Sequence, residues 1–275
     1  MELVDLDVNW QETCKVDYGV TGILRHTTKV FVKEKVAQEM VDKCFWNPLS
    51  KYYQMSYDDI INSWEINRER TQNIGHALDD YIGVILEPER MKDHHDLTYD
   101  QWVEKYKDDT EIMTVVNGWA RYWKHLEDIG YEMVKREQPF IREYHGKTLK
   151  GRADMILYYP PKDTILIIDW KSTADVTHSK KPAVCYMSGP EWVTKYPEEK
   201  LISYGLQVNT YKHMLIPLCN RPYNINTAII QIDRAGEAHA YPSPVPYDSK
   251  NMDELIDWCV AQQIEHPDKY EDMMR

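Results

Sequence analysis

The sequence predicts a mixed α/β fold in which a central mixed sheet is flanked by helices. Three observations predict it: the first half has helical apolar spacing, residues 131–170 change to strand alternation, and helical patterns return afterwards. The consecutive strands are joined by short turns, which argues against a regular alternation of strands and helices. The length of 275 residues suits one large domain, or one core with a helical extension.

The first half is expected to form an N-terminal helical region, residues 1–130, which packs on the core as one compact unit. Ser56 with Asp59, and Thr98 with Gln101, have the spacing of capping boxes, which begin helices. Helices are expected over residues 28–44, 56–64, about 71–86 and, with a break, 98–128.

The core is expected to span residues 131–275. Pro139 indicates an edge strand or a bulge, because proline cannot donate to a sheet ladder. The apolar run 164–170 is typical of a buried central strand. Strands are expected over 131–144, 148–159, 164–170, 224–232 and 237–241, a long loop over 172–199, and helices near 200–216 and 252–265.

Composition limits the function classes. Five scattered cysteines without a C-x-x-C pair argue against a disulfide framework, a zinc site or a cysteine-held iron–sulfur cluster, and favour a reducing compartment. No apolar run of about 18 residues exists, and the acidic start does not resemble a signal peptide. We therefore expect an intracellular protein without a membrane segment.

Charge is segregated along the chain. The formal net charge of −12 argues against a passive nucleic-acid coat, yet residues 134–152 hold six cations and two acids. Lys171, Lys180 and Lys181 extend this basic strip, whereas residues 87–111 hold nine acids and four cations. The strip could hold a phosphate backbone, or it could be an ordinary solvated hairpin.

Two carboxylates and a lysine carry the strongest chemical signal. Asp169 and Lys171 lie two apart at the end of a strand and point to one face, while Trp170 points to the other. If the second and third strands pair as a hairpin, Asp154 lies beside Asp169. Adjacent carboxylates suit Mg²⁺ or Mn²⁺, which polarises a phosphoryl oxygen and lowers the pKa of water. The alternative is a set of ordinary strand-end charges.

Other residues could complete such a site. His76 lies on a helix whose apolar face is marked by residues at steps of four, and it could add an imidazole ligand. Glu137 of the first strand could reach the site. Gln207 and Tyr211 share one helix face and could hold a phosphate or base. Each also has a purely structural interpretation, as a surface, core or solvated side chain.

Together these residues resemble the PD-(D/E)XK nuclease superfamily, in particular the RecB-type, lambda-exonuclease-like nuclease domain. The matching motifs occur in the family's order: Gly75-His76, Gly151 to Asp154, Asp169-Trp170-Lys171, and Gln207 to Tyr211. The resemblance covers about residues 65–232 and implies a restriction-endonuclease-like core. The IDWKS segment also resembles that of mitochondrial genome-maintenance exonucleases and of phage and large-virus nucleases, so a phage or viral origin is one option.

The resemblance implies a role for each matched residue. The metal ligands would be His76, Asp154, Asp169 and the backbone carbonyl of Trp170, and Lys171 would be catalytic with the two aspartates. Residues on the substrate side would be Gln207, Tyr211, Glu137, Arg152 and Ser172. The closely spaced C-terminal cysteines of the cluster-bearing members are absent, which implies a member without an iron–sulfur cluster.

The sequence therefore predicts a Mg²⁺- or Mn²⁺-dependent deoxyribonuclease, with an exonuclease favoured over an internal cutter by family analogy. Its partners would be single-stranded or end-containing DNA, and proteins of DNA replication, recombination or repair. Two alternatives stay open: a catalytically silent nucleic-acid-binding or scaffold protein with the same fold, and a metal-dependent nucleotide phosphohydrolase.

Overall fold

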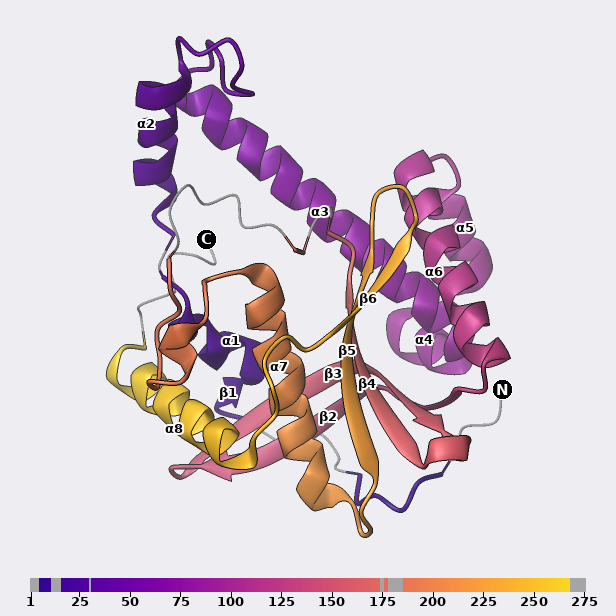
Figure 1. The fold of residues 1–275 in the computed structure, drawn as a ribbon. Helices are drawn as coiled ribbons and strands as arrows, with labels where there is room; N and C mark the ends of the chain where they lie inside the picture. Colours follow the sequence, from indigo (N-terminus) through magenta and orange to yellow (C-terminus); the bar gives the residue numbers. More distant parts are fainter. Residues whose placement is uncertain (1–4, 11–15, 30, 174–175, 178–184, 268–275) are drawn as a thin grey trace. The chain divides into compact units, whose positions relative to one another are not determined.

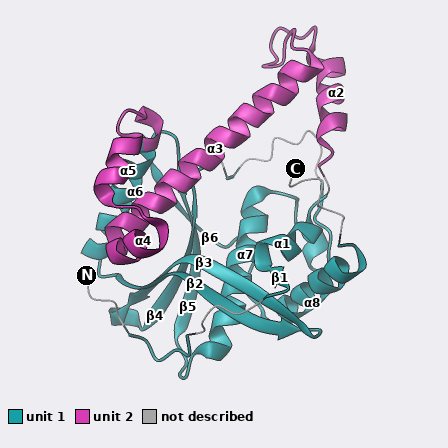
Figure 2. Ribbon diagram, turned by 180° about the vertical axis from the view of Figure 1, so that it is seen from behind, with its two compact units in different colours: residues 1–29, 113–269 teal, residues 30–112, 270–275 magenta. Residues whose placement is uncertain are grey.

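The structure is a computed structural model that describes residues 5–10, 16–29, 31–173, 176–177 and 185–267 (Figure 1). Contacts divide the chain into two compact units (Figure 2). Unit 1 comprises Met1–Lys29 and Met113–Lys269, and unit 2 is built on Val30–Ile112. Unit 1, which carries the sheet, thus also takes in segments that precede residue 130. The predicted basic residues Lys180 and Lys181 lie outside the described residues.

Among the described residues, unit 1 contains a six-stranded sheet. The strands are β1 (Tyr18–Gly19), β2 (Glu132–Tyr144), β3 (Lys147–Tyr159), β4 (Thr164–Lys171), β5 (Asn224–Ile232) and β6 (Ala238–Pro242). Their order is β1-β3-β4-β5-β6, with β2 paired to β3. β1 runs parallel to β3 and β4 runs parallel to β5, whereas the other pairs are antiparallel. This open mixed sheet with flanking helices confirms the predicted fold class and is consistent with a restriction-endonuclease-like core.

The strand positions follow from the sequence. β4 is central, between β3 and β5, which explains its nearly continuous apolar run. β2 pairs only with β3, so Pro139 sits on an edge strand, as predicted. The register of β2 shifts between Met133 and Lys135, so the bulge lies before the proline and not at it.

Helices cover both faces of the sheet in unit 1. One face carries α7 (Lys200–Leu215), which packs on strands β2 to β5 and against α1 (Val20–Leu24) and α8 (Ser249–Glu265) (Figure 1). The other face carries α6 (Thr110–Asp128), whose Trp119 ring lies 6.1 Å from that of Trp170. Gly118 allows α6 to approach the turn between β5 and β6, since a Cβ there would lie 2.2 Å from the carbonyl oxygen of Gly236. Trp170 therefore faces α6, and Asp169 and Lys171 face α7, as the alternation predicts.

Unit 2 is helical. Its helices are α2 (Lys33–Cys44), α3 (Tyr57–Leu86), α4 (Pro88–His95) and α5 (Tyr99–Tyr106). Both predicted capping boxes are present, at Ser56 and at Thr98. The prediction of two helices over 56–64 and 71–86 is wrong, because α3 is one continuous helix of 30 residues. The helix α4 was not predicted at all.

The continuity of α3 has a physical cause. The segment 65–70 consists of polar helix formers and one isoleucine, so it lacks an apolar period although its helix propensity is high. Ion pairs stabilise it instead: Glu65 pairs with Lys33 and with Arg68. The core of unit 2 lies further along, where the buried Trp102 donates from Nε1 to the carbonyl of Ala77 at 2.9 Å.

Four 3₁₀ turns complete the described structure, at Arg25–Thr27, Pro160–Lys162, Val193–Lys195 and Ile216–Leu218. The cysteines that the structure describes (Cys44, Cys185, Cys219 and Cys259) are all free thiols, whereas Cys14 lies outside the described residues. In the part of the chain that the structure covers, no helix combines the length and apolar character needed to cross a bilayer.

Candidate active site

Two carboxylates lie side by side on neighbouring strands of unit 1. In the antiparallel register of β3 and β4, Met155 pairs with Ile168, so Asp154 and Asp169 occupy the next opposite positions. Oδ2 of Asp154 accepts a 2.6 Å hydrogen bond from the backbone N–H of Trp170. Asp169 is almost completely buried, with 2% of its surface exposed. The structure thus confirms the predicted hairpin and the adjacency that depends on it.

The turn between β3 and β4 sets this register. Asp163 closes the Pro160–Lys162 turn in the left-handed conformation, with φ of 48°. Its carboxylate accepts from the Tyr158 hydroxyl at 2.8 Å and from the Arg221 guanidinium at 2.7 Å. A one-residue slip would turn every side chain of β4 to the other face. This turn therefore helps to keep Asp169 beside Asp154.

Lys171 completes the cluster. Its ammonium forms an ion pair with Oδ2 of Asp169, and 18% of its side chain is exposed. The same ammonium lies 4.6 Å from the ring centroid of Tyr204 on α7. Lys171 is therefore held between a carboxylate on its own strand and an aromatic ring on the helix above the sheet.

Glu137 also reaches this region, from the edge strand β2. The pairs Arg136–Met155 and Gln138–Ala153 flank it, which places Glu137 opposite Asp154. Its φ of 54° is left-handed, which is uncommon for glutamate and indicates a local distortion of the edge strand. Only 11% of its side chain is exposed, and its Oε2 forms an ion pair with Nε of Arg152 at 2.6 Å.

Gln207 and Tyr211 of α7 support the Asp169 carboxylate; Tyr211 is buried and Gln207 is partly buried. Nε2 of Gln207 donates to Oδ1 of Asp169 at 3.2 Å and to the hydroxyl oxygen of Tyr211 at 2.7 Å. Tyr211 is 3% exposed, and burial raises the pKa of its phenol to about 12. In this arrangement the two residues orient a carboxylate; their predicted contact with nucleic acid stays a prediction.

The glycine of the Gly-x-x-Asp motif makes room for this support. A Cβ at Gly151 would lie 2.9 Å from Cδ1 of Tyr211 and 3.2 Å from Sδ of Met214. A side chain at this position would therefore require the Tyr211 ring or α7 to move. The motif therefore couples two functions within four residues: Gly151 seats the tyrosine, and Asp154 faces Asp169.

The charges in this cluster influence one another. Burial and the neighbouring charge of Asp169 hold the pKa of Asp154 well above its usual range, although Lys171 and the Trp170 N–H act against this. Burial alone would lower the pKa of Lys171, but the carboxylates of Asp169 and Asp154 outweigh it and raise that pKa above its ordinary value. The lysine is therefore a cation at neutral pH, and two acidic groups share its charge.

The chemistry of these oxygens fits a hard divalent cation. Oδ2 of Asp169 is buried, and its partner is the Lys171 ammonium. Among the described residues, no group of three or more His, Cys, Asp or Glu side chains is placed to hold a metal ion. Mg²⁺ commonly uses one or two carboxylates, with water and substrate phosphates as its other ligands. Asp154 and Asp169 match that pattern.

The remaining predicted residues lie in several places. His76 is exposed on α3 of unit 2, so its role as a ligand stays a prediction. The apolar face predicted for its helix is confirmed, because Ile74, Leu78 and Ile82 are buried. Ser172 directly follows β4 and is half-buried.

Sequence reasoning missed two features of the site. Tyr204 precedes Gln207 by three residues, and this helical spacing could have placed it on the face that Gln207 and Tyr211 share. Thr21 of α1 was missed for a different reason: its hydroxyl bonds to Tyr211 across 190 positions of sequence, and no local pattern announces that contact.

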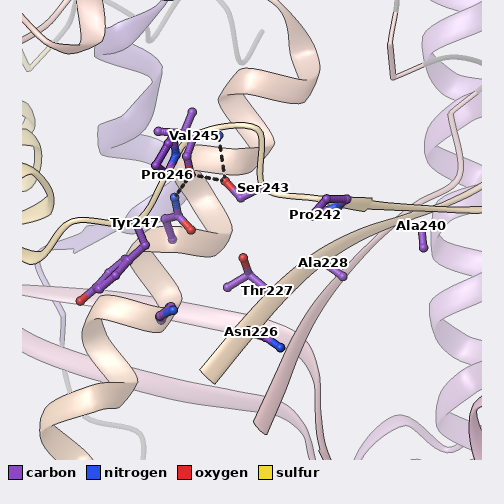
Figure 3. Close-up of a pocket in the computed structure, with 11 residues that line it drawn as sticks. Asn226, Thr227, Ala228, Ala240, Pro242, Ser243, Val245, Pro246 and Tyr247 are labelled. Atoms are coloured by element: carbon purple, nitrogen blue, oxygen red, sulfur yellow. Dashed lines mark hydrogen bonds between the residues drawn. The ribbon is translucent and has the colours of Figure 1, made fainter. Parts of the chain in front are cut away.

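A separate cavity of 540 Å³ lies between α7, the strands β5 and β6, and the segment 242–247 (Figure 3). Two of its polar side chains form hydrogen bonds within the protein. Nδ2 of Asn209 donates to the carbonyl of Val245 at 2.8 Å, and Nζ of Lys212 donates to the carbonyl of Ile225 at 2.6 Å. The cavity contains none of the predicted site residues. The Asn209 bond attaches the segment after β6 to α7, and the Lys212 bond attaches β5 to α7.

Comparison with known proteins gives distant structural likenesses. No family model and no curated protein matches the chain. The crystal structure of SSO0001 is similar with a TM-score of 0.30 and 15% identity, over 68% of this chain and 75% of that one. The crystal structure of "Putative exonuclease" from Eubacterium rectale is similar with a TM-score of 0.37 and 12% identity, over 68% of this chain and 65% of that one. TM-scores this low give no information about activity.

Proposed function

We propose that this chain is a cation-dependent deoxyribonuclease of the RecB-type PD-(D/E)XK superfamily. One observation carries the proposal: Asp154 and Asp169 lie on adjacent strands, and the Lys171 ammonium pairs with Asp169. The motif residues of the resemblance that lie in unit 1, from Gly151 to Tyr211, take part in this same cluster. A scaffold protein would have no need to bury two carboxylates against each other.

Asp154 and Asp169 would hold the cation, with the Trp170 carbonyl and His76 as further ligands implied by the resemblance. A bound Mg²⁺ or Mn²⁺ supplies Lewis-acid polarisation of a phosphoryl oxygen and lowers the pKa of water. The carboxylates supply the negative charge that the cation needs. Gln207 fixes the rotation of the Asp169 carboxylate, because it donates to Oδ1 and leaves Oδ2 to pair with Lys171.

Lys171 would act on the reacting phosphate itself. Its ammonium is largely shielded from solvent and permanently charged, so it can stabilise the negative charge that develops on the phosphoryl oxygens. It can also orient the attacking water by donating a hydrogen bond. Its distance from Asp169 along the strand is fixed by the two-residue repeat of β4.

The substrate side of the site is basic. Arg152 is 58% exposed and pairs with Glu137, so its guanidinium has donors left for a phosphate. Lys150 lies two residues before Arg152 on β3, so the two cations share one face of that strand. Two neighbouring cations favour a polymeric nucleic acid over a single nucleotide, because more than one phosphate can bind at once.

By family analogy the preferred substrate would be DNA with an end, single-stranded or duplex, and the reaction would be exonucleolytic. Such an activity belongs to DNA replication, recombination or repair. The free thiols among the described residues agree with a reducing compartment.

The test is a cleavage assay with single- and double-stranded DNA labelled at the 5′ or the 3′ end, and with RNA and mononucleotides as competing substrates. Each is incubated with Mg²⁺, Mn²⁺ or EDTA. We expect cation-dependent release of nucleotides from one labelled end, which also gives the polarity. Asp169→Asn should abolish cleavage, whereas Lys162→Ala, an exposed lysine of the β3–β4 turn, should not.

Other outcomes would replace the proposal. DNA binding without cleavage under every cation would support the scaffold alternative. Hydrolysis of mononucleotides alone would support the phosphohydrolase alternative.

A further inference from the structure

The ring of Tyr204 is the feature of the site that neither the sequence patterns nor the resemblance explain. Tyr204, Gln207 and Tyr211 lie three and four residues apart on α7, so they share one face of the helix. Gln207 and Tyr211 support Asp169, whereas Tyr204 contacts Lys171. One helix face thus serves both charged residues at the end of β4.

We propose that Tyr204 is a positioning residue that holds the Lys171 ammonium through a cation–π contact. The ammonium lies 4.6 Å from the ring centroid, well inside the range of about 6 Å over which the ring face attracts a cation. The inference rests on the proposed function, because the ammonium is positioned for the reacting phosphate.

Lysine needs such a contact more than arginine would. Its ammonium is a point charge on a flexible four-carbon stem, so a single ion pair leaves many rotamers open. Asp169 supplies one partner, and the Tyr204 ring supplies a second one from the opposite element. The attraction between the Tyr204 ring and the ammonium does not depend on the charge of Asp169. It therefore persists when Asp169 also pairs with another cation.

The ring, and not the hydroxyl, is the active part of Tyr204 in this proposal. Burial raises the pKa of the phenol, so the side chain is neutral at ordinary pH. Its electrostatic effect on Lys171 then comes from the quadrupole of the ring. Phenylalanine at this position keeps the ring, and leucine removes the ring but keeps an apolar side chain.

The first experiment compares Tyr204→Phe with Tyr204→Leu in steady-state DNA cleavage. We expect Tyr204→Phe to keep kcat within about twofold, and Tyr204→Leu to lower kcat about tenfold with little change in KM. Tyr106→Leu is the matched control, because the Tyr106 ring lies 4.7 Å from the Lys105 ammonium on α5 and belongs to unit 2, not to the unit that carries β3 and β4. It should cleave as the wild type does.

The second experiment does not depend on activity. Protein labelled with ¹³C at the lysine ε position is compared by NMR, and the Lys171 signal is identified by its absence in Lys171→Arg. The ring current should shift the Lys171 ε protons upfield in the wild type and in Tyr204→Phe, and the shift should vanish in Tyr204→Leu.

Two results would overturn the inference: equal loss of kcat in Tyr204→Phe and Tyr204→Leu, or an unshifted Lys171 signal in the wild type. A wild type that cleaves no substrate would overturn the proposed function, and the NMR comparison would still decide whether Tyr204 holds Lys171.

Discussion

Asp154 on β3 accepts a 2.6 Å hydrogen bond from the backbone N–H of Trp170 on β4. This bond ties the first carboxylate to the strand that carries the second, one residue beyond Asp169. It also places an acceptor where a sheet ladder would otherwise have a carbonyl. The hairpin register and this hydrogen bond together therefore fix where the two acidic groups lie.

Replacing Asp154 by asparagine should separate stability from activity. The variant keeps an acceptor for the Trp170 N–H and removes one of two buried like charges, so in EDTA the free energy of unfolding should rise by about 1 kcal/mol. Cleavage should fall by at least about 100-fold, because the proposed cation would lose a direct ligand. Urea unfolding and single-turnover cleavage measure the two effects.

The control for that variant is Glu132→Gln, which removes an exposed charge at the start of β2. It should change neither quantity. A destabilised Asp154→Asn in EDTA would show that the carboxylate, as an anion, is needed by the fold.

Gly151→Ala should destabilise the protein by about 1–3 kcal/mol, the usual cost of overpacking. The added Cβ would lie 2.9 Å from the Tyr211 ring, so the ring or α7 must shift, and this shift should disturb the hydrogen bonds that link Tyr211, Gln207 and Asp169. Cleavage should fall together with stability. Thermal unfolding and the cleavage rate measure the change.

Gly22→Ala provides the matched glycine substitution on α1 of the same unit. Nothing lies within 4 Å of a Cβ at Gly22, so this helical position should gain about 0.5–1 kcal/mol from the alanine. Equal destabilisation by both substitutions would contradict the specific role of Gly151.

Gln207→Leu should lower kcat about tenfold, because Asp169 loses the donor to its Oδ1. Tyr211→Phe should have a smaller effect, since it removes only the hydroxyl that accepts from Gln207. If both residues contacted DNA directly, the variants would mainly raise KM. Measuring kcat and KM separately distinguishes the two roles.

The ion pair of Arg70 with Asp109 predicts a pH dependence of the stability of unit 2. Arg70 hydrogen-bonds to Asp109 at 2.6 Å, which lowers the pKa of that carboxyl to about 2. A depressed native pKa stabilises the fold above the unfolded pKa, and this contribution is lost as pH falls from about 4 to about 2. Because 36% of the Arg70 side chain is exposed, solvent screens the pair, and the contribution at pH 7 should be at most about 1 kcal/mol.

Urea unfolding of Arg70→Met at pH 7 and at pH 2 tests this dependence. The difference from the wild type should be present at pH 7 and small at pH 2. Arg68→Met, which removes an ion pair with Glu65 within one helix, is the control with a smaller expected effect. A difference for Arg70→Met that is the same at both pH values would contradict the role of the ion pair.

Much of unit 1 could be predicted from the sequence because its signals are local. The strands β3, β4 and β5 and the helix α7 are confirmed near their predicted bounds, and the Asp154–Asp169 adjacency follows from one hairpin. The apolar run of β4 and the turn residues before it allowed that hairpin to be predicted.

The failures have equally specific causes. The middle of α3 is polar, so its helical signal lies in propensity and ion pairs and not in periodicity. The positive φ of Glu137 depends on how β2 meets β3, which no single strand encodes. Tyr204 resembles any other aromatic of a buried helix until Lys171 is seen opposite its ring.

The most direct test of the central claim is the single-turnover rate of DNA cleavage in Mn²⁺ for Lys171→Ala beside Lys162→Ala, with Asp154 and Asp169 intact. If the three residues form one hydrolytic centre, Lys171→Ala should lose at least about 100-fold in rate while its DNA binding is kept, and Lys162→Ala should match the wild type. Equal rates for the two variants would contradict the claim.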